Sequence, residues 1–147
     1  MDNDSKRIIT ELKETWHKMD GVYTLYAKSV GLNFTSILVL QFLSDFSQIF
    51  TQKDVCEKLE LPKQFVNSII KSLWEQGYVK LKEAKDRRNK DIIITESGKA
   101  YIQNVLKPLE DAEMAAWEDF SADEILSYAK TMEKYAQALE NALTNSK

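Results

Sequence analysis

The sequence predicts a mainly α-helical protein with one small β-hairpin, and two features of the chain support this fold class. Apolar residues recur at steps of three and four along most of the 147 residues, whereas strand-like patterns are confined to residues 78–95. Glycine and proline are scarce, with four and two residues respectively, as is typical of long helices joined by few tight turns. Because the length suits one packed unit, we expect residues 1–147 to form a single domain.

The first half of the chain predicts three helices of different kinds. An apolar stripe predicts a long helix over residues 5–30, and Gly31 ends it. Residues 35–46 are apolar on almost every side, which is typical of a central helix packed on several faces. Thr51 and Asp54 have the spacing of a capping box, so they predict the start of a short helix.

A further helix and a hairpin follow. Residues 62–76 carry a new apolar stripe that begins at a proline, which the first turn of a helix accepts, and Gly77 ends this helix. Residues 78–82 alternate in polarity and residues 92–95 are mostly β-branched. These two segments predict a two-stranded hairpin with a long charged tip.

Two long helices are predicted after the hairpin. Thr95 caps a helix over residues 96–117, and Ser121 with Glu124 forms a second capping box. The last helix then runs to about residue 143 on an apolar stripe of its own.

The composition limits the class of protein. Cys56 and His17 are the only cysteine and histidine, so the chain can form neither an internal disulfide nor a zinc site from them alone. The longest uncharged stretch, residues 29–44, is too short and too polar to span a bilayer, and no signal peptide opens the chain. We therefore expect a cytoplasmic protein without metal, cofactor or membrane partner. Cys56 is expected to be a packed core thiol, with redox sensing as the alternative.

The charge of the chain is concentrated in one segment. The formal net charge is −3, yet residues 62–90 hold eight basic and three acidic side chains, which gives this segment +5. A basic segment in an acidic chain attracts a polyanion to one face, although a solvated charged loop has the same composition. No nucleophile with an adjacent base, glycine-rich phosphate loop or carboxylate pair indicates an enzyme.

Two short helices joined by residues 60–62 and followed by a hairpin form a winged helix-turn-helix, which we place at residues 35–95. The second helix of such a pair enters the DNA major groove, so its outer face needs hydrogen-bonding groups and positive charge. The candidate DNA-contacting residues on this helix are Lys63, Gln64, Asn67, Ser68 and Lys71. A solvated amphipathic helix is the alternative, but Asn, Gln and Ser are a poor choice for solubility alone.

Arg87 and Arg88 are adjacent in the predicted hairpin tip. Arginine inserted into a narrow minor groove recognises the shape of DNA, so both residues are candidate DNA contacts. The alternative is a charged hairpin that only keeps the protein soluble, with Asp86 paired to one arginine.

Residues 86–98 resemble the wing signature of the MarR (multiple antibiotic resistance regulator) family, which reads Asp-x-Arg, a short polar stretch, an aliphatic strand and Thr-x-x-Gly. Residues 73–79, Leu-Trp-Glu-Gln-Gly-Tyr-Val, are similar to the exit of the family's recognition helix. The order of the predicted helices matches the family over nearly the whole chain. Phe65 departs from the small polar residue common near that position, and this departure concerns base specificity.

The resemblance implies a homodimer in which residues 1–34 and 96–147 form the dimerisation helices. It also implies a sequence-specific transcriptional regulator, expected to be a repressor, that binds double-stranded DNA at a pseudopalindromic operator. The alternative from the residues alone is a winged-helix architectural or assembly module that binds nucleic acid without sequence choice.

Many members of the family bind small aromatic or anionic ligands in a cleft between the dimerisation helices and the winged helix. By this resemblance, the residues that could line such a cleft here are Trp16, Met19, Tyr23 and Phe34. Ordinary core packing at helical spacing is the alternative for all four residues.

Overall fold

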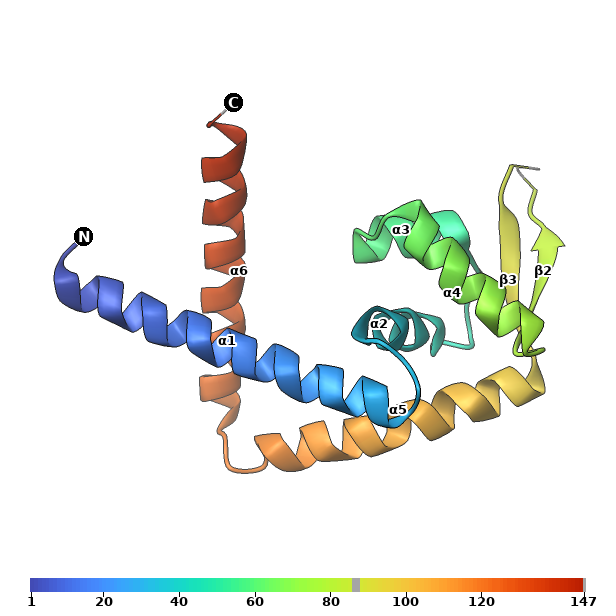
Figure 1. The fold of residues 1–147 in the computed structure, drawn as a ribbon, viewed down its shortest axis with the longest axis horizontal. Helices are drawn as coiled ribbons and strands as arrows, with labels where there is room; N and C mark the ends of the chain where they lie inside the picture. Colours follow the sequence, from blue (N-terminus) through green and yellow to red (C-terminus); the bar gives the residue numbers. More distant parts are fainter. Residues whose placement is uncertain (86–87, 147) are drawn as a thin grey trace. The chain divides into compact units, whose positions relative to one another are not determined.

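The computed structural model describes residues 1–85 and 88–146, and Figure 1 shows the path of the chain. The chain divides into two compact units, Met1–Leu109 and Glu110–Lys147. The predicted mainly α-helical fold with a small β element is confirmed. The elements in chain order are α1 (Asn3–Ser29), α2 (Phe34–Leu43), β1 (Phe50–Thr51), α3 (Gln52–Leu59), α4 (Lys63–Glu75), β2 (Val79–Glu83), β3 (Lys90–Ile94), α5 (Glu96–Trp117) and α6 (Ala122–Thr144).

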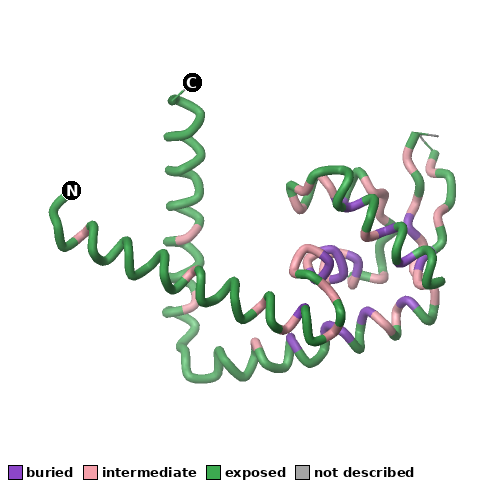
Figure 2. Tube along the Cα trace, viewed as in Figure 1, coloured by how far each residue is buried: buried purple, intermediate pink, exposed green. Residues whose placement is uncertain are grey.

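Helix α2 forms the centre of the first unit, as its apolar sequence predicts. Ile37, Val39, Leu40 and Leu43 are all buried, and Figure 2 shows that buried positions gather on α2 and on the elements around it. Close packing of so many apolar side chains is the main stabilising contribution in the unit. The other buried apolar residues of this cluster are Ala27, Val55, Val66, Ile70, Leu73, Val79, Ile92, Ile102, Val105, Leu106 and Leu109.

The helix ends have the predicted capping residues, except that Pro62 lies one position earlier in α4 than predicted. The N–H of Asp54 donates to the hydroxyl of Thr51 (3.2 Å), and the N–H of Thr51 donates to the carboxylate of Asp54 (2.8 Å). Gly77 follows α4 with φ of +76°, a conformation that glycine adopts without steric cost. Pro62, which was predicted to lie in the first helical turn, instead occupies the N-cap position of α4.

The sheet has three strands in the order β1-β3-β2, so the predicted hairpin of β2 and β3 is confirmed and the sequence missed the edge strand β1. Phe50 pairs with Ile92 and Thr51 with Asp91, which adds β1 to the edge of β3. A strand of two residues is too short to show any alternation in the sequence. The hairpin of β2 and β3 has the register Val79↔Ile94 to Glu83↔Lys90. Thr95 leaves the predicted strand because its hydroxyl caps α5.

The second unit contains the end of α5 and helix α6. The N–H of Ser121 donates to the carboxylate of Glu124 (2.8 Å), and this bond lowers the pKa of Glu124. The ring of Trp117 lies 5.1 Å from the ring of Phe120 and 6.3 Å from the ring of Tyr128. None of the described residues of α6 is buried.

Within residues 1–85 and 88–146, every helix is either too short or too polar to cross a membrane.

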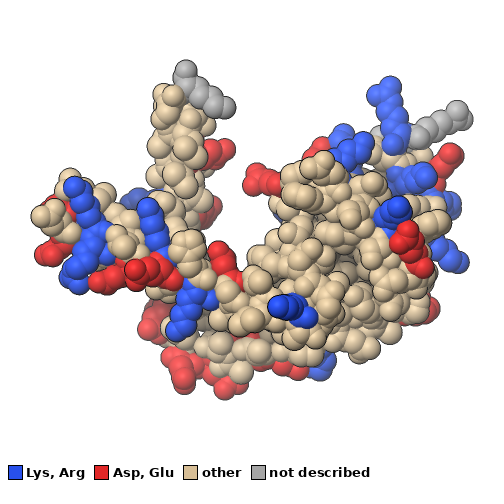
Figure 3. Space-filling view, in the orientation of Figure 1, with Lys and Arg blue, Asp and Glu red and all other residues tan. Residues whose placement is uncertain are grey.

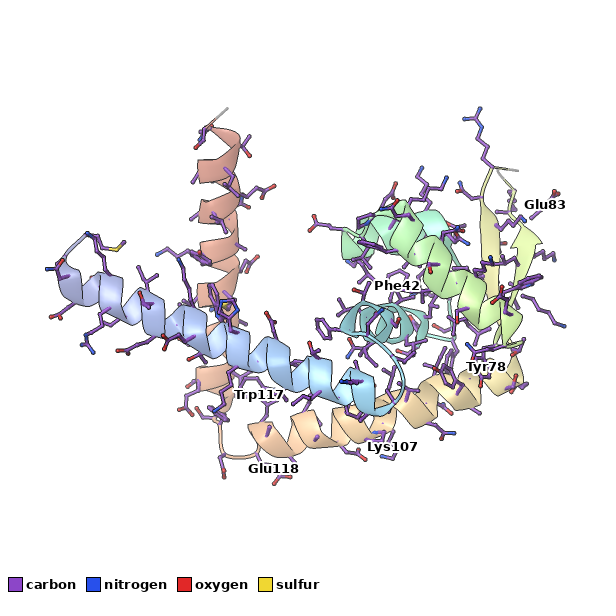
Figure 4. All side chains as sticks on the ribbon, in the orientation of Figure 1. Phe42, Tyr78, Glu83, Lys107, Trp117 and Glu118 are labelled. Carbon is purple, nitrogen blue, oxygen red and sulfur yellow. The ribbon has the colours of Figure 1, made fainter. Side chains whose placement is uncertain are left out.

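A junction of backbone and hydroxyl groups joins α4, the sheet and α5. The hydroxyl of Thr95 donates to the carbonyl oxygen of Gly77 (2.8 Å) and accepts from the N–H of Gly98 (3.0 Å). The N–H of Thr95 donates to the carbonyl oxygen of Tyr78 (3.0 Å). A Cβ atom on Gly98 would lie only 2.0 Å from that same carbonyl oxygen, so α5 packs this closely because residue 98 has no side chain. Figure 4 labels Tyr78 at this junction, where its ring stacks on the ring of Tyr101 at 4.2 Å.

We expect Gly98→Ala to lower the free energy of unfolding by about 2 kcal/mol or more, because overpacking costs roughly 1–3 kcal/mol and the obstructing atom here belongs to the backbone. Gly21→Ala is the matched control, since a Cβ atom at Gly21 meets nothing within 4 Å in the middle of α1. The control substitution should leave stability unchanged or raise it by up to about 1 kcal/mol. Urea unfolding followed by circular dichroism at one protein concentration measures both effects. Equal effects of the two substitutions would contradict the assigned role of Gly98.

Candidate nucleic-acid interface

Helix α4 exposes one polar face and buries the other. Val66, Ile70 and Leu73 are buried in the core, and Ile69 on the same apolar stripe is half-buried. The five residues that the sequence predicts as DNA contacts on this helix are all exposed: Lys63, Gln64, Asn67, Ser68 and Lys71. The predicted amphipathic arrangement of α4 is therefore confirmed.

A hollow of about 510 Å³ lies between α3, α4 and the hairpin, and we call it the basic hollow. It brings together Lys63 and Asn67 from α4 with Arg88 from the hairpin tip, three of the predicted contact residues. Arg87 lies outside the described residues. The described residues that line it are Gln52, Lys53, Cys56, Lys63, Asn67, Leu81, Arg88, Asn89 and Lys90.

The remaining predicted residues of α4 lie outside the basic hollow. Ser68 lines a second hollow of about 390 Å³ on the opposite flank of the helix, together with Ser72 and Gln76. The ammonium group of Lys71 lies 3.9 Å from the carboxylate of Glu75, with both side chains largely exposed. Such an exposed pair is worth about 0–1 kcal/mol, so it does not fix Lys71 in place.

The start of α4 differs from the starts of α3 and α6. Asp54 and Glu124 place carboxylates in the first turns of α3 and α6, whereas the first turn of α4 holds no acidic residue and Pro62 offers no side-chain cap. The N–H of Phe65 donates to the carbonyl oxygen of Pro62 (3.0 Å), so the N–H groups of Lys63 and Gln64 and the positive end of the helix dipole are left for an outside acceptor. Lys63, the first residue of α4, adds a full positive charge at the same place.

Cations surround the basic hollow. Among the described residues, Lys63 and Lys90 have no carboxylate within 4.0 Å, whereas Lys53 pairs with Glu57 at 3.7 Å on the exposed side of α3. Figure 3 shows Lys and Arg side chains gathered around the short helices and the hairpin. In the described part of the chain, the cations Lys53, Lys63, Arg88 and Lys90 line the basic hollow. This surface suits a polyanion.

Sequence reasoning missed Gln52 and Lys53, which bring the start of α3 to the basic hollow. The cause is the missed strand β1, because its pairing with β3 is what places the start of α3 beside the hairpin. Lys90 and Asn89 also line the hollow, and their position directly after Arg88 could have indicated them.

The expectation of a packed core thiol at Cys56 holds in part. Cys56 is half-buried and packs against the buried cluster, but it also lines the basic hollow.

The four candidate ligand residues are brought together only in part. The rings of Tyr23 and Phe34 lie 5.3 Å apart, and both pack against the buried cluster, in line with the core-packing alternative. Trp16 is half-buried and lies two turns before Tyr23 on α1, and Met19 is exposed and lies one turn before Tyr23. The second hollow lies near the start of α2, where it is lined by other residues, including Tyr101, whose pKa is raised by burial.

Comparison with known proteins shows what these features resemble. Residues 30–89 match the family model of the MarR family. The HTH-type transcriptional regulator SarZ of Staphylococcus epidermidis is 34% identical over 91 residues, and the chain spans 60% of that relative's length and 61% of its own in this match.

Solved structures extend the similarity to nearly the whole chain. NMB1585, a MarR family regulator from Neisseria meningitidis, has a TM-score of 0.80 and 25% identity, with 95% of this chain and 98% of that chain covered. BpsR of Bordetella bronchiseptica, whose DNA binding is regulated by 6-hydroxynicotinic acid, has a TM-score of 0.71 at 14% identity, with 92% and 97% covered, which supports the fold alone. Together with the winged helix-turn-helix, these matches show that the chain is similar to MarR family regulators.

Proposed function

We propose that the protein is a dimeric, sequence-specific transcriptional regulator, acting as a repressor, that binds double-stranded DNA at a pseudopalindromic operator. The observation that carries this proposal is the basic hollow, where Lys63 and Asn67 of α4 meet Arg88 of the hairpin. In winged-helix proteins of this kind the second helix enters the major groove while flanking elements contact the backbone or the minor groove. The open, uncapped start of α4 supports the same orientation, because it favours a phosphate.

The alternative function is an architectural or assembly module that binds nucleic acid without sequence choice. Non-specific binding needs only cations, whereas exposed amides such as those of Gln64 and Asn67 suit hydrogen bonds to base edges. Footprinting of the purified protein on DNA upstream of its own gene tests the proposal. A bounded protected site supports the regulator, and uniform protection favours the alternative.

We propose that apolar stripes on α1 and α6 are covered by a second copy of the chain. Ile8 and Val22 on α1 are 57% and 60% exposed, and Leu139 and Leu143 on α6 are 44% and 63% exposed. Exposed apolar surface on this scale is uncommon in a monomer and is typical of an interface. A two-fold dimer would place two α4 helices about one turn of DNA apart.

A ligand response is also proposed. By similarity to BpsR, whose ligand is a small aromatic acid, a small aromatic or anionic molecule would release the DNA. The candidate residues for this ligand remain Trp16, Met19, Tyr23 and Phe34.

The dimer predicts opposite results for two substitutions that introduce the same charge into α6. Leu139→Asp places a carboxylate on the apolar stripe and should shift sedimentation from dimer towards monomer, because burial of an unpaired charge is costly. Asn141→Asp, on the polar side of the same helix, should leave the dimer intact. Deletion of residues 121–147 should give monomer or aggregate. An intact dimer after the deletion, or a dimer that tolerates Leu139→Asp, would contradict the interface.

Asn67 and Lys71 should differ in what they contribute to DNA binding. Asn67→Ala should reduce the preference among operator variants by about 1–3 kcal/mol per site, because a direct contact to a base edge is lost. Lys71→Ala should weaken binding to every sequence alike and reduce the slope of log K against log salt by roughly one. Titrations on operator and scrambled DNA at several salt concentrations measure both effects. Identical, uniform losses for the two variants would refute the role of Asn67.

Arg88 should contribute affinity without changing base preference in the major groove. Arg88→Ala removes a cation from the hairpin and should weaken binding at fixed salt, while Arg88→Lys should restore part of the loss because lysine keeps the charge but lacks the planar guanidinium. Binding isotherms on the operator compare the three proteins. An Arg88→Ala variant that binds as tightly as the wild type would show that the hairpin is solvated and that Arg88 does not contribute to DNA binding.

A further inference from the structure

Phe65 is a large aromatic side chain that the core does not use. It is the third residue of α4 and is 52% exposed. It belongs neither to the buried cluster nor to the half-buried side chains that pack against it. Among the described residues, its ring has no aromatic or cation partner, whereas Phe34, Phe42, Phe46, Phe50 and Phe120 each have one.

The position of Phe65 on α4 points to the surface proposed to face DNA. It lies in the uncapped first turn, between Gln64 on the outer face and the buried Val66. At 100° per residue it shares a flank with Ser68 and Ser72, opposite to the flank on which Asn67 lines the basic hollow. The first residues of a recognition helix are the ones that reach base edges in the major groove.

The apolar stripes proposed for dimerisation lie elsewhere. They run along α1 and α6, whereas Phe65 lies in the first turn of α4, the turn that begins with the cation Lys63. The occupant of this surface must therefore combine negative charge with an apolar group. DNA meets both requirements, because the C5-methyl group of thymine is an apolar substituent on the major-groove edge of a base.

We propose that Phe65 contacts the C5-methyl group of a thymine, so that each operator half-site carries a thymine beneath the first turn of α4. The inference rests on the proposed function and deepens it, because it names one base and the side chain that selects it. A phenyl ring forms no hydrogen bond with a phosphate and gains nothing from the other major-groove acceptors. Its contribution is the removal of ring and methyl surface from water, worth roughly a fourfold change in affinity per half-site.

Replacement of thymine by uracil tests the contact, because uracil lacks only the methyl group. The preferred site is first obtained by selection from random DNA with the full-length wild-type protein. Each thymine of a half-site is then replaced by uracil, and the affinity is measured by titration. We expect one thymine position per half-site at which the wild type loses roughly fourfold.

Three variants complete the experiment. Phe65→Ala should bind the thymine and uracil sites equally well at that position, while Phe65→Leu should keep most of the discrimination through its apolar side chain. Trp74→Ala is the matched control, since Trp74 is 54% exposed but lies at the other end of α4. This control should discriminate as the wild type does. Thermal unfolding of all variants should stay near the wild type, because neither ring belongs to the core.

The outcomes separate this inference from the function on which it rests. A wild-type protein that selects no sequence refutes the proposed function and the inference with it. A wild type that selects a site but is insensitive to uracil at every thymine overturns the inference alone. Three results for Phe65→Ala would assign Phe65 to another contact. The variant could lose affinity equally on thymine and uracil DNA, or it could discriminate between them as well as the wild type does. It could also dissociate to monomer in sedimentation.

Discussion

The contact between the backbone of Tyr78 and residue 98 sets the geometry of the winged helix. The carbonyl oxygen of Tyr78 occupies the space where a side chain on Gly98 would begin, and Thr95 bonds to the backbone on both sides of this contact. The end of α4, the first residue of β2 and the first turn of α5 therefore meet within a few atoms. Since the hairpin leaves from this point and α4 ends at it, the junction decides where Arg88 lies relative to Asn67.

Signals that act within a few residues could be read from the sequence. The capping pairs Thr51–Asp54 and Ser121–Glu124, and the left-handed glycine after α4, depend only on near neighbours and were predicted correctly. Strand β1 could not be found, because two residues carry no period and its partner lies about forty residues later in the chain. The same limit hid Gln52 and Lys53 from the candidate site. The reason for glycine at position 98 is equally non-local, since the obstructing atom belongs to Tyr78.

The helix termini distribute charge in a consistent way. Carboxylates stabilise the starts of α3 and α6, and the positive ends of those two helices are thereby neutralised. Only α4 among these three begins without a carboxylate, at the place where Lys63 also stands. The start of α4 therefore lacks the stabilisation that a side-chain cap would give, at the place where the cations gather. The capping pattern and the charge pattern, which are independent features of the sequence, therefore agree on the same surface.

The position of Cys56 has a practical consequence. It is the only cysteine of the chain, and it lines the basic hollow between α3, α4 and the hairpin. A thiol-reactive fluorophore attached there would stand at the candidate interface without any engineered residue or competing label. Its emission would respond to the local water content and to nearby anions in the hollow. The protein thus carries a built-in attachment point for a spectroscopic reporter of occupancy on this surface.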